Sequence, residues 1–227
     1  MPAMQRDWNA PPSETSRFAY CGLNQTHADG LLVAFFVESM YGLINKAIRD
    51  MILEGHGEEL WTRVRVRAGV DAECFEAMEP YPDGLTKQLI AAASEELQQH
   101  PHDLMRAFGE FWVIHTAAEG YGQLMELAGS SLPEFLQNLD DLHARVGVNF
   151  PSLVPPSFET EEPAPGTIHL HYHSQREGLA PMVIGLVEGL GDRFDTPVDV
   201  DQLAWRSEGD DHDVFEVRFD EPQTPGS

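Results

Sequence analysis

The stretch TIHLHYHSQREG, from Thr167 to Gly178, interleaves two sets of side chains. Residues two apart on a strand share a face, and neighbouring residues point to opposite faces. One set is three histidines, and the other combines two hydroxyls with a guanidinium: His169, His171 and His173, against Tyr172, Ser174 and Arg176. Because the apolar residues alternate in phase with the second set, the histidines are expected to point towards solvent. The stretch therefore predicts a strand that carries either a histidine metal site or an anion site.

The residues before this strand have a helical period. Between residues 40 and 150 apolar side chains recur at i, i+3 and i+4. The last helix of this region is predicted from Ser131 to Val146. Ser131 and Glu134 form a capping-box pattern, and Gly147 ends the helix.

The remaining residues have a strand period. Residues 154–166 read as a proline-rich connector, and strands are predicted at 168–174, 198–205 and 214–219. An apolar helix at 179–194 connects the first two. The predicted fold class is α+β: an N-terminal helical region followed by a small C-terminal antiparallel β-sheet with a crossover helix.

The first 39 residues are polar, proline-bearing and aperiodic over most of their length. We expect residues 1–39 to be an N-terminal extension that is disordered or accessory. Residues 40–220 are expected to form one domain, and residues 221–227 a C-terminal tail.

Composition excludes several classes of partner. The chain has 38 Asp and Glu against 14 Lys and Arg, a formal net charge of −24, which argues against binding to nucleic acid or to an anionic membrane. Cys21 and Cys74 match no metal or haem-attachment spacing and favour a reducing compartment over a disulfide scaffold. The apolar run Leu31–Val37 is too short to span a bilayer, and it lacks the flanks of a signal peptide. We therefore expect a cytoplasmic protein.

His143 shares the apolar stripe of the predicted Ser131–Val146 helix. A histidine in that position is usually a core residue with one hydrogen bond. The functional alternative is an axial ligand, because a neutral imidazole on a rigid helix beside a dry cavity suits a haem iron. The helix pattern alone leaves both interpretations open.

Tyr172, Ser174 and Arg176 would together make a carboxylate clamp, since arginine binds bidentately and hydroxyls donate from fixed positions. A buried haem has two propionates that need such partners. The alternative is an ordinary polar strand end. The three histidines would suit Zn²⁺ or Cu²⁺, but no Asp or Glu at ligand spacing completes the set nearby.

Four segments resemble the H-NOX family, the haem-based nitric oxide/oxygen-binding domains related to the haem domain of soluble guanylate cyclase. They are MYGLINKAI (40–48), LDDLHARVG (139–147), PSLVPPSF (151–158) and HYHSQREGLAPMVIGLVEGL (171–190). The resemblance covers about residues 40–220. It is specific, because the helix histidine, the Pro-Pro pair thirteen residues later and the Y-x-S-x-R strand occur in the family's order and spacing.

The resemblance implies a non-covalent haem b (Fe-protoporphyrin IX) buried between the helices and the sheet, with His143 as the axial ligand of its iron. It implies that Tyr172, Ser174 and Arg176 hold the propionates. It also implies that Pro156 presses on the macrocycle.

The same resemblance predicts the ligand. Oxygen-binding members carry a distal tyrosine nine residues after the first residue of the Y-x-S-x-R motif, and that count falls on Pro181. The other distal positions are Ile44, Ile48 and Trp112, and none obviously offers a hydroxyl to bound O₂. Such a donor is worth about 1–3 kcal/mol in a dry pocket. We therefore expect a sensor that binds NO and CO at ferrous haem and discriminates against O₂.

The resemblance further implies signalling by release of the proximal His143. The partner would be a separate effector, a histidine kinase or a cyclic-di-GMP enzyme, as for free-standing bacterial members. Some bacterial members also carry a Cys/His zinc site that links the segment after the Pro-Pro pair to the C-terminal hairpin. Here those stretches read FETEE and GDDHD, with no cysteine and only His212, so we expect that zinc site to be absent.

Two other functions remain open. One is a metal-dependent enzyme that uses His169, His171 and His173. The other is a haem-free interaction module with the same fold. Catalysis at the haem itself is not expected, because the distal positions show no acid/base pair.

Overall fold

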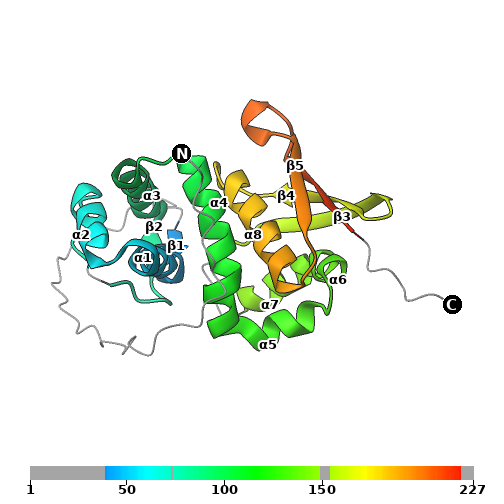
Figure 1. Ribbon diagram of the computed structural model, residues 1–227, viewed down its shortest axis with the longest axis horizontal. Coiled ribbons are helices and arrows are strands. Elements are labelled where there is room, and N and C mark those ends of the chain that lie inside the picture. The colour runs from blue at the N-terminus through cyan, green and yellow to red at the C-terminus, as the bar shows by residue number, and fades with distance from the viewer. Residues whose placement is uncertain (1–38, 73, 149–153, 221–227) are drawn as a thin grey trace, which may run out of the picture. The chain divides into compact units, whose positions relative to one another are not determined.

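Two apolar cores organise the residues that the computed structural model describes, which are 39–72, 74–148 and 154–220. All of them belong to one unit of the chain, Phe35–Ser227. The predicted N-terminal extension, apart from Ser39, and the predicted tail lie outside the described residues. The α+β prediction is confirmed, with helices first and an antiparallel sheet last (Figure 1).

Helices supply most of the first core. Its elements are α1 (Gly42–His56), α2 (Glu58–Arg67), α3 (Asp83–Leu97) and α4 (Pro101–Phe111). Two short strands, β1 (Ser39–Tyr41) and β2 (Pro80–Pro82), pair antiparallel beside them and were not predicted. The apolar stripes of these helices bury a set of side chains that includes Ile48, Ile52, Val64, Leu89 and Phe108.

The predicted helix Ser131–Val146 is two helices, α6 (Leu132–Gln137) and α7 (Leu139–Gly147). Asn138 separates them, because its side-chain amide donates to the carbonyl of Ala128 and its backbone leaves helical geometry. The capping pattern is also displaced. Ser131 Oγ accepts from the Glu134 amide, but the Glu134 carboxylate accepts from Ser130. Before α6 come a π-helical turn, η1 (Trp112–Ala117), and α5 (Ala118–Ala128).

The sheet has the order β3-β4-β6-β5 and is antiparallel throughout. Its strands are β3 (Ser157–Ala164), β4 (Thr167–His173), β5 (Val198–Ala204) and β6 (Asp213–Phe219), with α8 (Ala180–Arg193) crossing over after β4 and a 3₁₀ turn, η2 (Arg206–Glu208), before β6. The connector predicted at 154–166 is wrong, because most of it is the edge strand β3. An edge strand tolerates Pro163, which lies where the register shifts.

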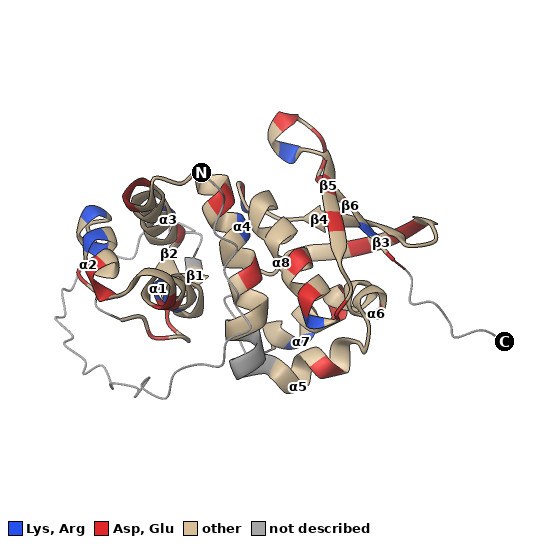
Figure 2. Ribbon diagram, viewed as in Figure 1, with Lys and Arg blue, Asp and Glu red and all other residues tan. Residues whose placement is uncertain are grey.

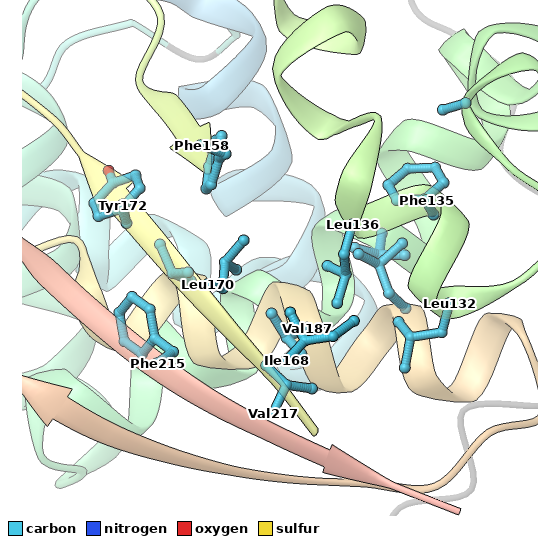
Figure 3. Packing of buried hydrophobic residues seen from close by; sticks show 14 of the residues in the cluster. Leu132, Phe135, Leu136, Phe158, Ile168, Leu170, Tyr172, Val187, Phe215 and Val217 are labelled. Carbon is cyan, nitrogen blue, oxygen red and sulfur yellow. The ribbon is translucent and has the colours of Figure 1, made fainter. Parts of the chain in front are cut away.

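The second core lies between this sheet and the helices α5, α6 and α8. Figure 3 shows Leu170, Phe215 and Val217 from the sheet on the same side as Val187 from α8. Trp112 packs against both cores.

Helices α4 and α8 connect the two cores and touch through their backbones. A Cβ atom on Gly185 would overlap the carbonyl oxygen of Arg106, and one on Gly109 would overlap that of Met182. Glycine is required at both positions because the two helices leave no room for a side chain. Arg106 and Glu188 add an ion pair beside this contact.

Three carboxylates gather along the same helix pair. Burial raises the pKa of Glu110 from its ordinary value of 4.5 to about 7, and the negative charges of Glu188 and Asp192 add to the rise. Arg106 opposes it. Glu110 is therefore largely neutral in mildly acidic solution.

Two expectations from composition concern described residues. Cys74 is disulfide-bonded, contrary to the expectation from the cysteine spacing, and the other cysteine, Cys21, lies outside the described residues. Among the helices that the structure describes, none combines the length and apolarity needed to cross a bilayer.

Substituting Gly185→Ala should destabilise the protein by about 1–3 kcal/mol, because the new methyl group forces α4 and α8 apart. Gly122→Ala is the matched control. Gly122 lies within α5 with open space around its Cα, so alanine should stabilise by about 0.5–1 kcal/mol. Urea unfolding of both variants measures the difference, and equal stabilities would contradict the close contact.

The raised pKa of Glu110 predicts a pH dependence of stability. The folded protein binds this proton more tightly than the unfolded chain, so the contribution of Glu110 is lost as pH rises from about 4.5 through about 7. Glu110→Gln should therefore raise the free energy of unfolding at pH 8 by about 1 kcal/mol, discounted because the side chain is partly exposed. At pH 4.5 the variant and the wild type should agree. A variant that is equally or less stable at pH 8 would contradict the assignment.

Candidate functional site

A cavity of about 640 Å³ lies between the two cores. Its size is in the range of cofactor pockets, about 300–1,000 Å³. The walls are mostly apolar and come from both cores, with Ile44 and Ile48 from α1, Phe108 from α4, Leu170 from β4 and Leu186 from α8 among the lining residues. The cavity is therefore largely apolar and is lined by side chains from elements far apart in sequence.

His143 lines this cavity from α7. Its Nδ1 lies 2.8 Å from the carbonyl oxygen of Leu139, one turn earlier. Since a carbonyl only accepts, Nδ1 carries the proton and Nε2 keeps its lone pair. Burial lowers the pKa of His143, although the Leu139 carbonyl and Asp140 oppose the shift. The imidazole is therefore held in the neutral, single-tautomer form that binds a metal ion.

The helix that carries His143 is attached to the sheet through Phe158. Asp140 of α7 accepts a hydrogen bond of 3.0 Å from the Phe158 amide of β3. The Phe158 ring lies 5.1 Å from that of His143 and 5.3 Å from that of Tyr172, centroid to centroid. Figure 3 shows Phe158 and Tyr172 on adjacent strands near Leu170. The histidine and the Y-x-S-x-R strand thus belong to one wall of the site.

Tyr172, Ser174 and Arg176 line the cavity where β4 ends. Burial raises the pKa of Tyr172, so its phenol stays protonated and can donate. Arg176 donates through Nε to Asp83 Oδ2 at 3.2 Å and through a terminal nitrogen to the carbonyl of Val154. Asp83, at the start of α3, also lines the cavity, and its Oδ1 is buried without a hydrogen-bond partner among the described residues. One edge of the cavity therefore combines hydroxyl donors with a fixed cation.

The structure brings eight of the nine predicted cofactor-binding residues to this cavity: Ile44, Ile48, Trp112, His143, Pro156, Tyr172, Ser174 and Arg176. Pro181 is not part of the described wall. Leu179, Met182, Val183 and Leu186 line the cavity at helical spacing, and Pro181 falls between them on another face of α8. The assignment of Pro181 as a distal position of the gas site stays a prediction.

Met182 and Asp83 are among the wall residues that sequence reasoning missed. The i, i+3, i+4, i+7 stripe of α8 could have identified Met182. No local pattern could have identified Asp83, because its contact with Arg176 joins residues 93 positions apart.

The histidines of β4 lie away from the cavity. Ile168, Leu170 and Tyr172 are buried, and the alternate positions are only partly so. His169 lies 3.3 Å from the carboxylate of Glu216 on β6, whereas His171 lies 2.8 Å from His212. The three histidines therefore do not act as one set.

These residues fit a non-covalently bound haem. The wall supplies one neutral imidazole with a free lone pair, an apolar interior and a cationic, hydroxyl-bearing edge for two carboxylates. The groups that would bind the haem, an imidazole, two hydroxyls and a guanidinium, all line the cavity.

The sequence is similar to known haem-binding proteins. Residues 41–202 match the family model described as Haem-NO-binding. Soluble guanylate cyclase gcy-31 of Caenorhabditis elegans is 32% identical over 166 residues, which are 72% of this chain and 24% of that protein. Guanylate cyclase soluble subunit beta-2 of Rattus norvegicus is 35% identical over 120 residues, 50% of this chain and 18% of that protein. The chain thus spans about a quarter or less of these relatives.

Solved structures share the fold. An H-NOX protein from S. oneidensis in the Fe(II)NO ligation state superposes with a TM-score of 0.73 at 17% identity, covering 80% of this chain and all of that one. An oxygen-binding H-NOX domain related to soluble guanylate cyclases gives 0.68 at 20% identity, covering 83% and 99%. The family match extends over more than half of the sequence, and the cavity carries the donors that a haem needs. The chain therefore belongs to the Haem-NO-binding (H-NOX) family of haem-binding sensor domains, related to the haem domain of soluble guanylate cyclase.

Proposed function

We propose that this domain senses nitric oxide through a ferrous haem b whose proximal ligand is His143. CO binds as well, and O₂ is excluded. The observation that carries the proposal is the hydrogen bond from His143 Nδ1 to Leu139, which leaves Nε2 directed at no protein partner that the structure records. When bound, the haem would supply an iron that can bind a diatomic gas.

The haem is proposed to be of the b type. Covalent attachment requires the C-x-x-C-H pattern, and the sequence contains two cysteines, Cys21 and Cys74, neither in such a motif. Arg176, Ser174 and Tyr172 bind the propionates, with Asp83 and the Val154 carbonyl holding the guanidinium in place. Pro156 lies on the cavity wall, where it would contact a bound macrocycle.

Selectivity follows from the distal wall. The family includes both NO-bound and oxygen-binding structures, so membership alone does not decide the ligand. Ile44, Ile48 and Met182 line the cavity, and none of their side chains has an O–H or N–H group. Bound O₂ gains negative charge and needs a donor, whereas NO binds ferrous iron without one. In this proposal, the indole N–H of Trp112 does not donate a hydrogen bond to the bound gas.

Signalling is proposed to begin with release of His143. The residues of helix α7 that line the cavity are Leu139, Leu142, His143 and Val146, and the described polar contact of α7 with the sheet is the single Asp140–Phe158 hydrogen bond. An element with few polar contacts to its neighbours moves at low free-energy cost. If His143 were released from a bound iron, α7 would be free to move against β3 and would present an altered surface. It would then be a two-state element whose populations the gas controls.

The effector is proposed to be a separate histidine kinase or cyclic-di-GMP enzyme, and this rests on family resemblance alone. The curated relatives are soluble guanylate cyclases, so a nucleotide cyclase is the second candidate. A cytoplasmic location is part of the proposal, supported by the description of those relatives as soluble. The metal-dependent enzyme is not favoured, because His169, His171 and His173 face away from the cavity and do not converge.

His143→Gly should reduce the haem content of purified protein at least tenfold, because it removes the iron–protein bond. Imidazole added to the growth medium should restore it. His102→Ala is the matched control, since His102 also lines the cavity and should not be needed. The pyridine haemochrome assay measures haem per chain, and circular dichroism checks folding. A folded His143→Gly protein with full haem content would refute the ligand assignment.

Reduced protein in air should give no stable oxygenated spectrum, whereas NO and CO should each shift the Soret band. Met182→Tyr places a hydroxyl on the cavity wall and should strengthen O₂ binding by about 5–150-fold, the equivalent of about 1–3 kcal/mol. Pro181→Tyr should leave O₂ binding unchanged, since position 181 lies outside the described wall. A stable oxygenated wild type that is lost in Trp112→Phe would show instead that the indole is a donor.

A further inference from the structure

The β5–β6 hairpin contributes one basic side chain to the end of β4. Arg206, in the turn η2, is the only lysine or arginine between the two strands, and it lies in a stretch that is otherwise acidic (Figure 2). The recorded partner of its guanidinium is not one of the neighbouring carboxylates. A terminal nitrogen donates a hydrogen bond of 2.6 Å to the carbonyl oxygen of Ser174. The hairpin therefore holds the backbone of the Y-x-S-x-R segment.

Ser174 lies just beyond the last residue of β4, where the sheet no longer holds the chain. His173 is the last residue of β4 that pairs with β3, and Tyr172 is the last one that pairs with β6. Among the described residues, the recorded donor to the Ser174 carbonyl is the Arg206 guanidinium. Backbone segments held by few hydrogen bonds open at low free-energy cost. The position of the Ser174 backbone therefore depends on Arg206.

Ser174 is connected to both other members of the motif. Its Oγ accepts a hydrogen bond of 3.1 Å from the backbone amide of Arg176. Its hydroxyl is also hydrogen-bonded to the phenol of Tyr172. Since Tyr172, Ser174 and Arg176 form one edge of the cavity, which we call the donor edge, a displacement of Ser174 moves the whole edge.

The charge of Arg206 acts at the same edge. Burial raises the pKa of the Tyr172 phenol. The hydrogen bond with Ser174 opposes that rise, and so do the positive charges of Arg176 and Arg206. Asp213 adds to the rise. Arg206 thus lies close enough to the donor edge to stabilise negative charge there.

The hairpin fixes Arg206 in turn. The Arg206 backbone amide donates to Asp213 Oδ1 at 3.1 Å, and the same oxygen accepts from the Gln202 side chain at 2.8 Å. The amide of Gly209 closes the turn by donating to the Arg206 carbonyl, and its φ of 111° favours glycine. Asp213 is also the strand partner of Tyr172. The guanidinium therefore projects from a turn that is anchored beside the motif.

We propose that Arg206 is a positioning residue for the donor edge, an inference that rests on the proposed haem-binding function. Its guanidinium holds the Ser174 carbonyl, and through it the hydroxyls and the Arg176 guanidinium that bind the haem propionates. Arg206 is not among the residues that line the cavity, so it acts through Ser174 and through its charge. Propionate binding thus depends on a residue 32 positions after the serine of the motif.

Haem release from the purified, haem-loaded protein tests this role, with transfer to excess apomyoglobin followed by absorbance. Arg206→Met keeps an unbranched side chain but removes the donor and the charge. Haem release should accelerate about tenfold, the effect of losing a hydrogen bond that involves a charged group. Arg206→Gln is a second neutral variant with the same expectation.

Two further variants test whether the charged donor is what matters. Arg206→Lys keeps the charge and can donate to a single acceptor, so it should stay within about threefold of the wild type. Arg193→Ala is the matched control. Arg193 is exposed at the end of α8, and its loss removes the same charge from the protein without touching the donor edge. Thermal melting of each variant checks folding.

Haem dimethyl ester separates positioning from general stability, because both propionates are esterified and carry no charge. In protein reconstituted with the ester, Arg206→Met and the wild type should release it at the same rate. Unchanged haem release in Arg206→Met, or equal acceleration with haem and with its ester, would overturn the proposal. A wild type that takes up no haem would instead refute the proposed function itself.

Discussion

The alternation of β4 is the constraint on which the candidate site depends. Successive residues of a strand cannot share a face. The sequence HLHYH therefore places its histidines on one face of the strand and its leucine and tyrosine on the other. Leu170 and Tyr172 turn to the cavity, and His171 and His173 turn outward. A shift of one residue in pairing would place imidazoles in the haem cavity and the phenol in solvent. The buried face, anchored by Ile168 and Leu170 at essentially zero exposure, prevents that shift.

Much of the fold could be predicted because its elements follow simple periods. Strands β4, β5 and β6 and helix α8 were predicted close to their observed bounds. Apolar residues recur at every second position in the strands and at every third or fourth position in the helix. β3 was missed because its sequence, SFETEEPA, has one buried position, Phe158, and carries a proline. The break at Asn138 was missed because it depends on a hydrogen bond to Ala128 in another helix, which no local period encodes.

Some residues of the candidate site could likewise be predicted from sequence, and others could not. Residues of the recognised motifs were found from sequence, and the structure places them on one cavity, although the ligand roles of His143, Tyr172, Ser174 and Arg176 remain proposals. Contacts between distant segments could not be inferred: Asp83 meets Arg176 through the packing of α3 beside the end of β4. The same holds on the outer face, where His212 looked solitary in the sequence and gains His171 and His173 only through strand pairing.

The backbone contact between α4 and α8 has a mechanical consequence. At Gly109 and Gly185 no side chain separates the two helices, so no rotamer change can absorb a displacement there. Helices α4 and α8 therefore move as one rigid unit that packs against both cores. Widening or narrowing of the cavity must therefore arise at its perimeter, by movement of α7 or of the Asp83–Arg176 edge, while the centre of the domain keeps its dimensions.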